Sequence, residues 1–366
     1  MTLLLSVPPS YALSAMAEEG KDASNEALDG IDRDRVTEWL GDRVDGLETP
    51  LTFARISGGR SNLTFSVTDA AGARWALRRP PLGKTLGSAH DMGRESKVIS
   101  ALAETEVPVP RVIGHCDDDS VNGAPFYVMD WVEGPILRSQ AEASIFDEQQ
   151  RSEIGRRVVE TLATIHAVDP DAVGLGDLGK KTDYAARQLH RWQGQWEKSK
   201  TDELPVVDEV HRRLAERIPE QRDATIVHGD YRLDNMILTP TGEVAAVVDW
   251  ELSTLGDPMA DVGMLIVYWA EQGDDLIPLI DPATRAPGFQ SREQVREIYA
   301  GASGRDLSEV DYFVALAYWK LAIILQGVFK RFSAGGYGDA AEGFEGFENV
   351  IGGLAEAASD AIDQLD

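Results

Sequence analysis

The chain has 366 residues, of which 43% are apolar, and this is enough for two packed units or one large bilobal domain. Its formal net charge of −27 argues against a protein that binds nucleic acid or an anionic membrane, since both partners require a basic face. The basic residues are nine lysines and 26 arginines, a composition that fits a high-salt cytoplasm and an ordinary acidic enzyme equally well.

The first thirty residues show no core-forming pattern. The start, MTLLLSVPPSYALSAMA, has a short apolar run like a signal peptide, but it lacks a positive n-region and is interrupted by Pro8 and Pro9. Residues 17–30 are polar, so we expect 1–30 to be a disordered leader. The single Cys116 excludes an intrachain disulfide and a cysteine metal site. No run approaches the roughly 18 uninterrupted apolar residues of a membrane span, so we expect a cytoplasmic protein without a membrane partner.

The next hundred residues alternate like a small sheet. Val36, Leu40 and Val44 follow helical spacing and predict a leading helix. A second helix is predicted over RESKVISALAE, with Ser88 as its cap. Five strands are predicted, over 51–57, 62–68, 74–79, 107–116 and 124–134. The prolines of the fourth strand confine it to an edge of the sheet.

Beyond Gly134 the sequence is mainly helical. Helices are predicted over 147–168, 182–200, 204–218, 257–272, 292–301 and 307–332. At the fourth of these, Asp257 is expected as the N-cap and Pro258 at the first helical position. Short strands interrupt the helices at 224–228, 235–239 and 243–250, and the turn-forming PTGE joins the last two.

The segments IVHGDYRLDN and AVVDWE place polar residues at strand ends. If 236–239 and 244–248 pair as a hairpin, Asn235 and Asp249 emerge at the same end, with Asp230 on the loop before them. Carboxylate and amide oxygens suit Mg²⁺ better than zinc, and Mg²⁺ commonly shares its shell with nucleotide phosphates. A carboxylate left off the metal could orient or deprotonate a hydroxyl. The alternative is that these side chains only cap the hairpin.

His228, Asp230 and Asn235 keep the spacing of the catalytic loop H-x-D-x-x-x-x-N of protein-kinase-like phosphotransferases. Together HGDYRLDN, VVDWE and GDPMADVG resemble the aminoglycoside phosphotransferase and choline kinase superfamily over about residues 35–335. The branch that they resemble is the kinase-like domains linked to acyl-CoA dehydrogenases. The resemblance implies an α+β, bilobal fold with a small antiparallel sheet lobe over 31–132 and a larger helical lobe over 133–366.

The resemblance also implies roles for the loop residues. Asp230 would be the catalytic base or the group that orients the hydroxyl, and His228 would brace the loop. Asn235 and Asp249 would hold Mg²⁺. Asp261, the later aspartate of GDPMAD, would steady the catalytic loop.

The small lobe is expected to bind ATP. The hairpin between the first two strands could cover phosphates with its backbone N–H groups, and it comprises Ser57, Gly58, Gly59, Arg60 and Ser61. Arg78 stands where the resemblance places a phosphate-binding cation, with Glu95 as its helix partner. The alternative is a surface ion pair worth about 0–1 kcal/mol. Arg79 and Lys84 would add positive charge there.

The strand FYVMDWVEG would run into the linker between the lobes. Backbone groups near Asp130 and Val132 would bind the adenine edge, and Met129 would lie behind it or simply in the core. Aromatic residues on two helices are candidates for an acceptor site or for core packing; they are Tyr184, Trp192, Trp196, Tyr268 and Trp269. Lys330 and Arg331 could hold a coenzyme A phosphate or only follow a helix C-terminal preference.

These features favour an ATP- and Mg²⁺-dependent phosphotransferase that acts on a small-molecule hydroxyl. The branch makes a hydroxyacyl-CoA the leading acceptor, while a sugar, an amino alcohol and an aminoglycoside stay open. A non-catalytic pseudokinase is the main alternative, and retention of Asp230, Asn235 and Asp249 argues against it. Hydrolysis of a phosphoester would not need the glycine-rich hairpin. A protein kinase would need a longer activation loop after Asp249.

Overall fold

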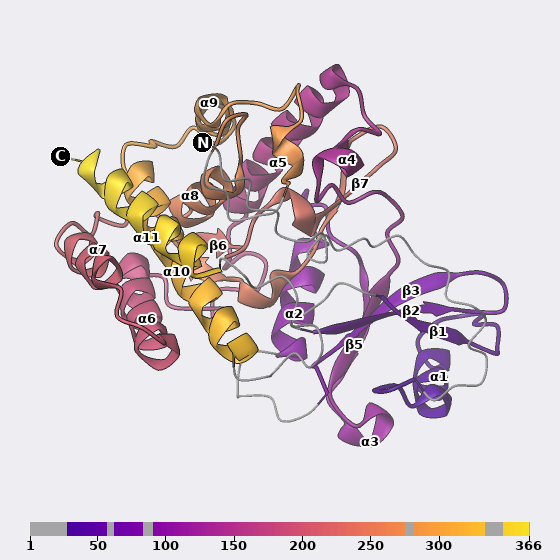
Figure 1. Cartoon of the computed structure of the whole chain (residues 1–366). Coiled ribbons are helices and arrows are strands. Elements are labelled where there is room, and N and C mark those ends of the chain that lie inside the picture. The colour runs from indigo at the N-terminus through magenta and orange to yellow at the C-terminus, as the bar shows by residue number, and fades with distance from the viewer. Residues whose placement is uncertain (1–27, 57–61, 83–90, 275–280, 334–346, 366) are drawn as a thin grey trace.

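The computed structural model describes residues 28–56, 62–82, 91–274, 281–333 and 347–365. Its N-terminal part is one antiparallel sheet with strand order β1-β2-β3-β5-β4 (Figure 1). The strands are β1 (Thr52–Arg55), β2 (Leu63–Thr68), β3 (Arg74–Arg79), β4 (Val112–Cys116) and β5 (Phe126–Asp130). The helices of this lobe are α1 (Arg33–Gly41), α2 (Met92–Leu102) and the short α3 (Asp119–Asn122). The fourth strand lies at an edge, as its prolines predicted.

Both faces of the sheet are covered, which explains the near-continuous apolar run of β5. Phe126 and Val128 pack in the cluster that includes α1. Tyr127 and Met129 point the other way, into the core shared with α2 and the helical lobe.

The second helix has a different N-cap from the one predicted. It starts at Met92, and the Asp91 side chain accepts a hydrogen bond from the Arg94 N–H at 2.9 Å. The cap is therefore Asp91 and not Ser88, because an aspartate directly before the helix satisfies the orphan N–H groups of its first turn. Ser88 lies outside the described residues.

The second lobe is mainly helical, so the α+β bilobal prediction is confirmed (Figure 1). Its α-helices are α4 (Gln140–Ala143), α5 (Glu148–Ala167), α6 (Tyr184–Ser199), α7 (Pro205–Ala215), α8 (Met259–Tyr268), α9 (Arg292–Ser303), α10 (Val310–Ser333) and α11 (Phe347–Asp363). Short 3₁₀ turns are η3 (Leu233–Asn235), η4 (Trp250–Leu252) and η5 (Ala283–Arg285). For six of these helices, most of the predicted ends lie within a few residues of the observed ends.

Two details of this lobe differ from the sequence predictions. Asp257 does accept a hydrogen bond from the Met259 N–H, at 2.9 Å, but Pro258 takes the cap position and the helix begins at Met259. The last helix, α11, was not predicted. It packs along α10 and buries Leu354 and Ala358, and its Gly- and Ala-rich sequence gives weak periodic contrast.

Helix α10 is the central helix of the lobe. Between Val310 and Arg331 it is long and apolar enough to cross a membrane by composition alone, but 67% of its most apolar window is buried. It packs against α8 and α11, as a core helix does.

Four short strands frame the loop between β6 and β7. β7 (Met236–Leu238) and β8 (Val244–Val247) form the predicted antiparallel hairpin. β6 (Thr225–Val227) pairs instead with β9 (Thr254–Gly256), a strand that the sequence did not predict. The two pairs hold 228–235 and 248–253 side by side.

Candidate active site

The loop 228–235 is anchored by one buried carboxylate. Asp261 of α8 is fully buried and accepts hydrogen bonds from the backbone N–H of His228 at 2.6 Å and of Gly229 at 2.8 Å. His166 of α5 contacts the same carboxylate through Nε2 at 3.3 Å. Burial would raise the pKa of Asp261, but these hydrogen bonds, with His166 first, hold it below its usual value.

His228 is buried inside the loop that it begins. Its Nε2 lies 3.1 Å from the Val248 carbonyl, and the Asp230 N–H donates to its Nδ1 at 3.3 Å. The imidazole also packs against the Trp250 ring, with the centroids 4.7 Å apart. The side chain therefore links the loop to the segment after β8, which agrees with a bracing role and leaves no ring nitrogen facing solvent.

Gly229 needs to be a glycine. Its φ of +86° lies in the left-handed region, and an added Cβ would come 2.9 Å from the Leu252 carbonyl oxygen. Its carbonyl accepts a hydrogen bond from Lys320 Nζ at 2.9 Å. Residues from α8, α10 and the 248–253 segment thus fix this turn together.

Asp230, Asn235 and Asp249 converge as the hairpin predicted. The Val248 N–H donates to the Asn235 carbonyl at 2.9 Å, which places the two strand ends side by side. Asn235 Nδ2 donates to the Asp230 carbonyl at 2.8 Å and to its carboxylate at 3.2 Å. Asp249 follows with a φ of +68°, a left-handed conformation that is uncommon outside glycine and that concentrates at functional sites.

Arg78 reaches this cluster from the small lobe. Its Nη2 lies 2.5 Å from Asp249 and 3.6 Å from Glu251, and its Nε lies 3.2 Å from Glu95 of α2. Burial would lower the pKa of Arg78, but Glu95 and then Asp249 raise it further, so the guanidinium is charged. Only 13% of the Arg78 side chain and 1% of that of Glu95 are exposed, which rules out the alternative of a surface pair.

Burial disfavours the charged form of Glu95. Burial raises its pKa to about 7, against the opposing effect of Arg78. Neither carboxylate oxygen has a well-aligned hydrogen bond within the described residues, although the Tyr127 hydroxyl and Arg78 lie beside the carboxylate and both lower its pKa. The pair is held by charge and packing rather than by hydrogen-bond geometry.

Arg94 joins the small lobe to the helical lobe beside this pair. Its Nη2 donates to the Leu178 carbonyl at 2.6 Å and to the Ser253 carbonyl at 2.9 Å. Asn62 adds a bond to Glu251 at 2.8 Å. The lobes are therefore positioned by contacts on 251–253, directly after Asp249.

Several of these residues were missed from the sequence. Glu251 stands two positions after Asp249, and the repeated acid in VDWE was the available signal. Arg232 lies 3.6 Å from Asp230 and 3.5 Å from Asp234, with its guanidinium 5.0 Å from the centre of the Tyr268 ring. Burial and the nearby Asp230 raise the pKa of the Tyr268 hydroxyl well above its usual value.

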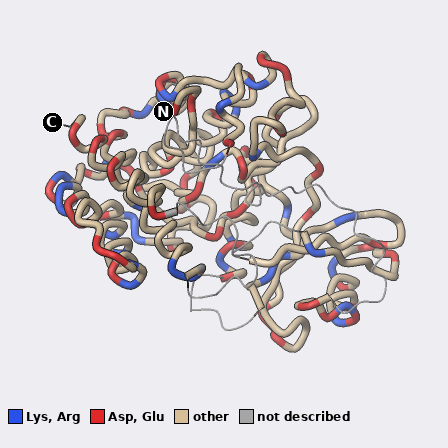
Figure 2. Tube along the Cα trace, viewed as in Figure 1, with Lys and Arg blue, Asp and Glu red and all other residues tan. Residues whose placement is uncertain are grey.

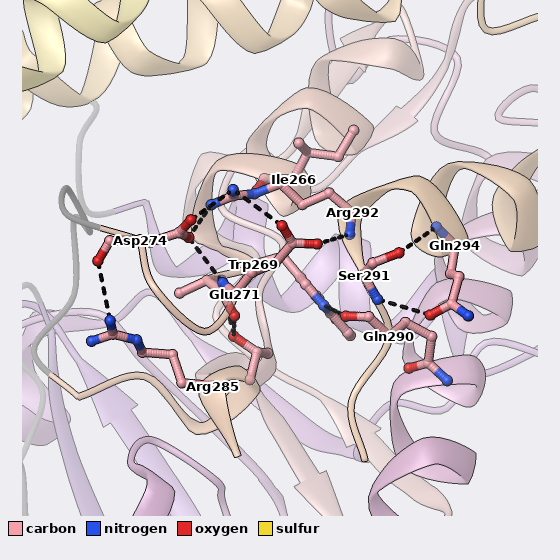
Figure 3. Close-up of polar contacts among 11 residues, drawn as sticks. Ile266, Trp269, Glu271, Asp274, Arg285, Gln290, Ser291, Arg292 and Gln294 are labelled. Carbon is pink, nitrogen blue, oxygen red and sulfur yellow. Dashed lines mark hydrogen bonds and ion pairs between the residues drawn. The ribbon is translucent and has the colours of Figure 1, made fainter. Parts of the chain in front are cut away.

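A polar network joins the segment that follows Tyr268 to the start of α9 (Figure 3). Arg292 donates to Asp274 at 2.6 Å and, through its backbone N–H, to Glu271 at 2.7 Å. Trp269 Nε1 donates to the Gln290 carbonyl at 2.7 Å. Trp269 is therefore a buried residue with a satisfied N–H, and together with Tyr268 it also lines a small hollow beside Arg232 and Asp234.

The residues present fit a magnesium ion that shares its shell with phosphates. Asp249 is 32% exposed on its side chain and Asn235 is close by, so a carboxylate and an amide oxygen are available together. Within the part of the chain that the structure describes, no group of three His, Cys, Asp or Glu side chains forms a metal site. Mg²⁺ commonly takes one or two carboxylates plus phosphate oxygens.

Other predicted site residues have mixed outcomes. Ser57, Gly58, Gly59, Arg60, Ser61 and Lys84 lie outside the described residues. The prediction that Arg79 adds positive charge near the phosphates is wrong. Its side chain donates to the Gly30 and Asn122 carbonyls, on the opposite face of β3 from Arg78.

The linker strand gives a partial picture. Met129 is buried and packs in the large core. The Asp130 N–H already donates to the Arg111 carbonyl at 2.8 Å, so this donor is not open to an adenine edge. Val132 follows the strand and is half-buried.

The aromatic residues of α6 divide between core and cavity. Trp196 is fully buried, which agrees with core packing. Tyr184 and Trp192 line a hollow next to Gly229. Lys330 donates to the Lys198 carbonyl at 2.5 Å, and the glycine-rich segment after it lies outside the described residues.

Comparison with known proteins agrees with this geometry. The Phosphotransferase enzyme family profile matches residues 52–306. The chain is 34% identical to mouse acyl-CoA dehydrogenase family member 10 over 333 residues, which cover 90% of this chain and 30% of that protein. The chain thus spans less than a third of that relative.

Solved structures share the fold. A crystal structure from Ralstonia eutropha JMP134, of a protein named for the aminoglycoside phosphotransferases, is 32% identical with a TM-score of 0.78, covering 91% of this chain and 99% of its own. An aminoglycoside phosphotransferase in a ternary complex with AMP-PNP and hygromycin B has a TM-score of 0.57 at 16% identity, covering 89% and 98%. The two-lobed architecture agrees with these solved structures, and the chain belongs to the phosphotransferase enzyme family.

Proposed function

We propose that this protein transfers the γ-phosphate of ATP, with Mg²⁺, to a hydroxyl group of a small molecule. The observation that carries the proposal is the convergence of Asp230, Asn235 and Asp249 at one hairpin end, next to the Arg78–Glu95 pair of the other lobe. Phosphoryl transfer depends mainly on positioning and charge stabilisation, and this arrangement provides both.

In this proposal each residue acts at a stated atom. The Asp230 carboxylate, 25% exposed, orients the acceptor O–H and takes its proton as the new O–P bond forms and the bond from the γ-phosphorus to ADP breaks. Asn235 and Asp249 hold Mg²⁺, which neutralises phosphate charge when bound. Arg78 contacts the nucleotide phosphates, and Glu95 keeps it in place.

The acceptor that we propose is a hydroxyacyl-CoA. Similarity to an acyl-CoA dehydrogenase family protein over 90% of this chain supports an acyl thioester as the molecule that carries the hydroxyl. Sugars, amino alcohols and aminoglycosides are the alternatives, since relatives of one fold phosphorylate different hydroxyls.

A non-catalytic nucleotide-binding role is the second candidate. Such a protein would be expected to lose the base or a metal ligand, and this chain retains Asp230, Asn235 and Asp249. Arginine at position 78 is the one departure from the lysine of protein kinases, and its buried pairing with Glu95 keeps the charge in place.

The test is Mg²⁺-dependent ADP release from ATP over a panel of hydroxylated acceptors: 4-hydroxyacyl-CoA, choline, sugars and an aminoglycoside. Asp230→Asn is the matched control, because it keeps the side-chain shape and removes the base. We expect turnover with one acceptor class, lost by at least about a hundredfold in the variant. ATP binding without turnover on any acceptor would favour the non-catalytic role, and absence of ATP binding would refute the assignment of the 228–249 cluster.

A further inference from the structure

A small hollow, partly open to solvent, lies next to the catalytic loop. Its wall comes from α6, α8 and α10 together with Gly229. Tyr184, Trp192 and Phe313 give it aromatic surface. The lining includes Gly229, the residue before the proposed base, and Lys320, whose ammonium lies within electrostatic range of the Asp230 carboxylate.

Two charged side chains belong to the described lining, and their situations differ. Both carboxylate oxygens of Asp261 already have hydrogen-bond partners, namely two backbone N–H groups and His166. Lys320 Nζ has three N–H bonds, and among the described residues it makes one hydrogen bond, to the Gly229 carbonyl at 2.9 Å. The ammonium is therefore the group in this hollow with hydrogen bonds left to give.

The surroundings of Lys320 strengthen its attraction for a negative partner. Burial lowers its pKa, which marks a poorly hydrated ammonium, while the carboxylates of Asp230 and Asp261 favour its charged form. A desolvated cation interacts more strongly with an oxygen ligand than a hydrated one does.

The same ammonium argues against a cationic acceptor. Lys320 Nζ lies 5.6 Å from the centre of the Trp192 ring, so a cation already lies within interaction range of that ring. A quaternary or primary ammonium bound at Trp192 would meet a like charge in a partly dehydrated site.

We propose that Lys320 is a specificity-determining residue. Its ammonium binds the carbonyl-type oxygen of a carboxylate or a thioester that lies a few bonds from the acceptor hydroxyl, and it rejects cationic acceptors. This inference rests on the proposed function and narrows its acceptor class. The apolar chain between the two groups lies against Tyr184, Trp192 and Phe313.

The test uses four acceptors with the same four-carbon spacing and different charge. They are 4-hydroxybutyrate, its pantetheine thioester, 1,4-butanediol and 4-amino-1-butanol. We expect kcat/KM for the carboxylate or the thioester to exceed that for the amine by at least about tenfold, and the diol to lie between them. If 4-hydroxybutyrate is the better acceptor of these two, Lys320 binds a carboxylate oxygen; if its pantetheine thioester is better, Lys320 binds a thioester oxygen.

Lys320→Met should lose this preference, so that kcat/KM for the carboxylate or the thioester no longer exceeds that for the amine. Lys330→Met is the matched control, because Lys330 is on the same helix and also donates to a backbone carbonyl, that of Lys198, outside the hollow. It should behave like the wild type. Lys320→Gln keeps a donor for the Gly229 carbonyl without the charge, so it should lose the preference even if Lys320→Met disturbs the loop.

Equal kcat/KM for the anion and the amine, or a preference that survives both Lys320 variants, would overturn the inference while leaving phosphotransfer intact. If no acceptor is phosphorylated by the wild type, the proposed function fails separately. Equilibrium binding, followed by tryptophan fluorescence, then decides the inference: tighter binding of 4-hydroxybutyrate than of 4-amino-1-butanol, lost in Lys320→Gln, supports it. Equal binding refutes it.

Discussion

Asp261→Asn should destabilise the helical lobe far more than a change of one atom suggests. The wild-type carboxylate accepts from two buried backbone N–H groups, at 2.6 and 2.8 Å, and from His166. An asparagine keeps one oxygen and turns its NH₂ toward the second backbone N–H. That donor then has no acceptor in a buried site.

The magnitude follows from these contacts. A hydrogen bond to a charged group contributes about 1.5–3 kcal/mol, and leaving a buried donor unpaired costs about 1–3 kcal/mol. With one such bond lost and the other weakened to a neutral one, we expect Asp261→Asn to lower the free energy of unfolding by about 3 kcal/mol. Activity should fall as well, because the same N–H groups set the turn before Asp230.

Urea unfolding of the helical lobe, followed by tryptophan fluorescence, measures this loss. The control is Asp171→Asn, which removes an exposed ion pair to Lys181 and should change stability by less than about 1 kcal/mol. Because the pKa of Asp261 is lowered in the folded state, its contribution is present above its ordinary value of 3.8 and is lost as the pH falls through the folded pKa. Two variants of equal stability near neutral pH would refute the assigned role of Asp261.

Three further changes test the site. Arg78→Met breaks a buried ion pair, so we expect a loss of about 3–5 kcal/mol in thermal or urea unfolding and a higher KM for ATP, with Arg78→Lys intermediate. Burial raises the pKa of Glu95 to about 7 from 4.5, so its contribution to stability is present below pH 4.5 and is lost as the pH rises through about 7. Glu95→Gln should remove that slope from melting curves between about pH 5 and about pH 8. Gly229→Ala, at a φ of +86° and facing the Leu252 carbonyl, should lower kcat by more than about tenfold while circular dichroism keeps its helical signal.

The convergence of the site was predictable because hairpin geometry is local. Once PTGE joins two short strands, the residues before the first and after the second must meet, and Asn235 and Asp249 do. The Arg78–Glu95 pair came from the resemblance and not from any pattern in the residues. The direction of Arg79 could have been foreseen, because successive residues of a strand face opposite sides and Arg78 and Arg79 cannot both face the phosphates.

Long-range contacts were not predictable in the same way. Lys320 and Gly229 lie 91 positions apart and meet because α10 packs against α8 and α6, which no local spacing encodes. The pairing of β6 with β9 is similar, since a three-residue strand carries too little pattern to be recognised. The packing of α10 against α6 and α8 forms the wall of the hollow, so the proposed acceptor specificity was the part least accessible from sequence.

The charges around the loop also explain why metal and nucleotide should act together. Asp and Glu are spread over both lobes (Figure 2), but exposed charges farther away than about 8 Å are largely screened at physiological salt. The local set decides the potential, and there five carboxylates lie within 3.6 Å of two guanidinium groups, namely Glu95, Asp249 and Glu251 at Arg78, and Asp230 and Asp234 at Arg232. This excess of negative charge would repel free ATP, and a divalent cation held by Asp249 would offset it and would leave Arg78 available to the phosphates.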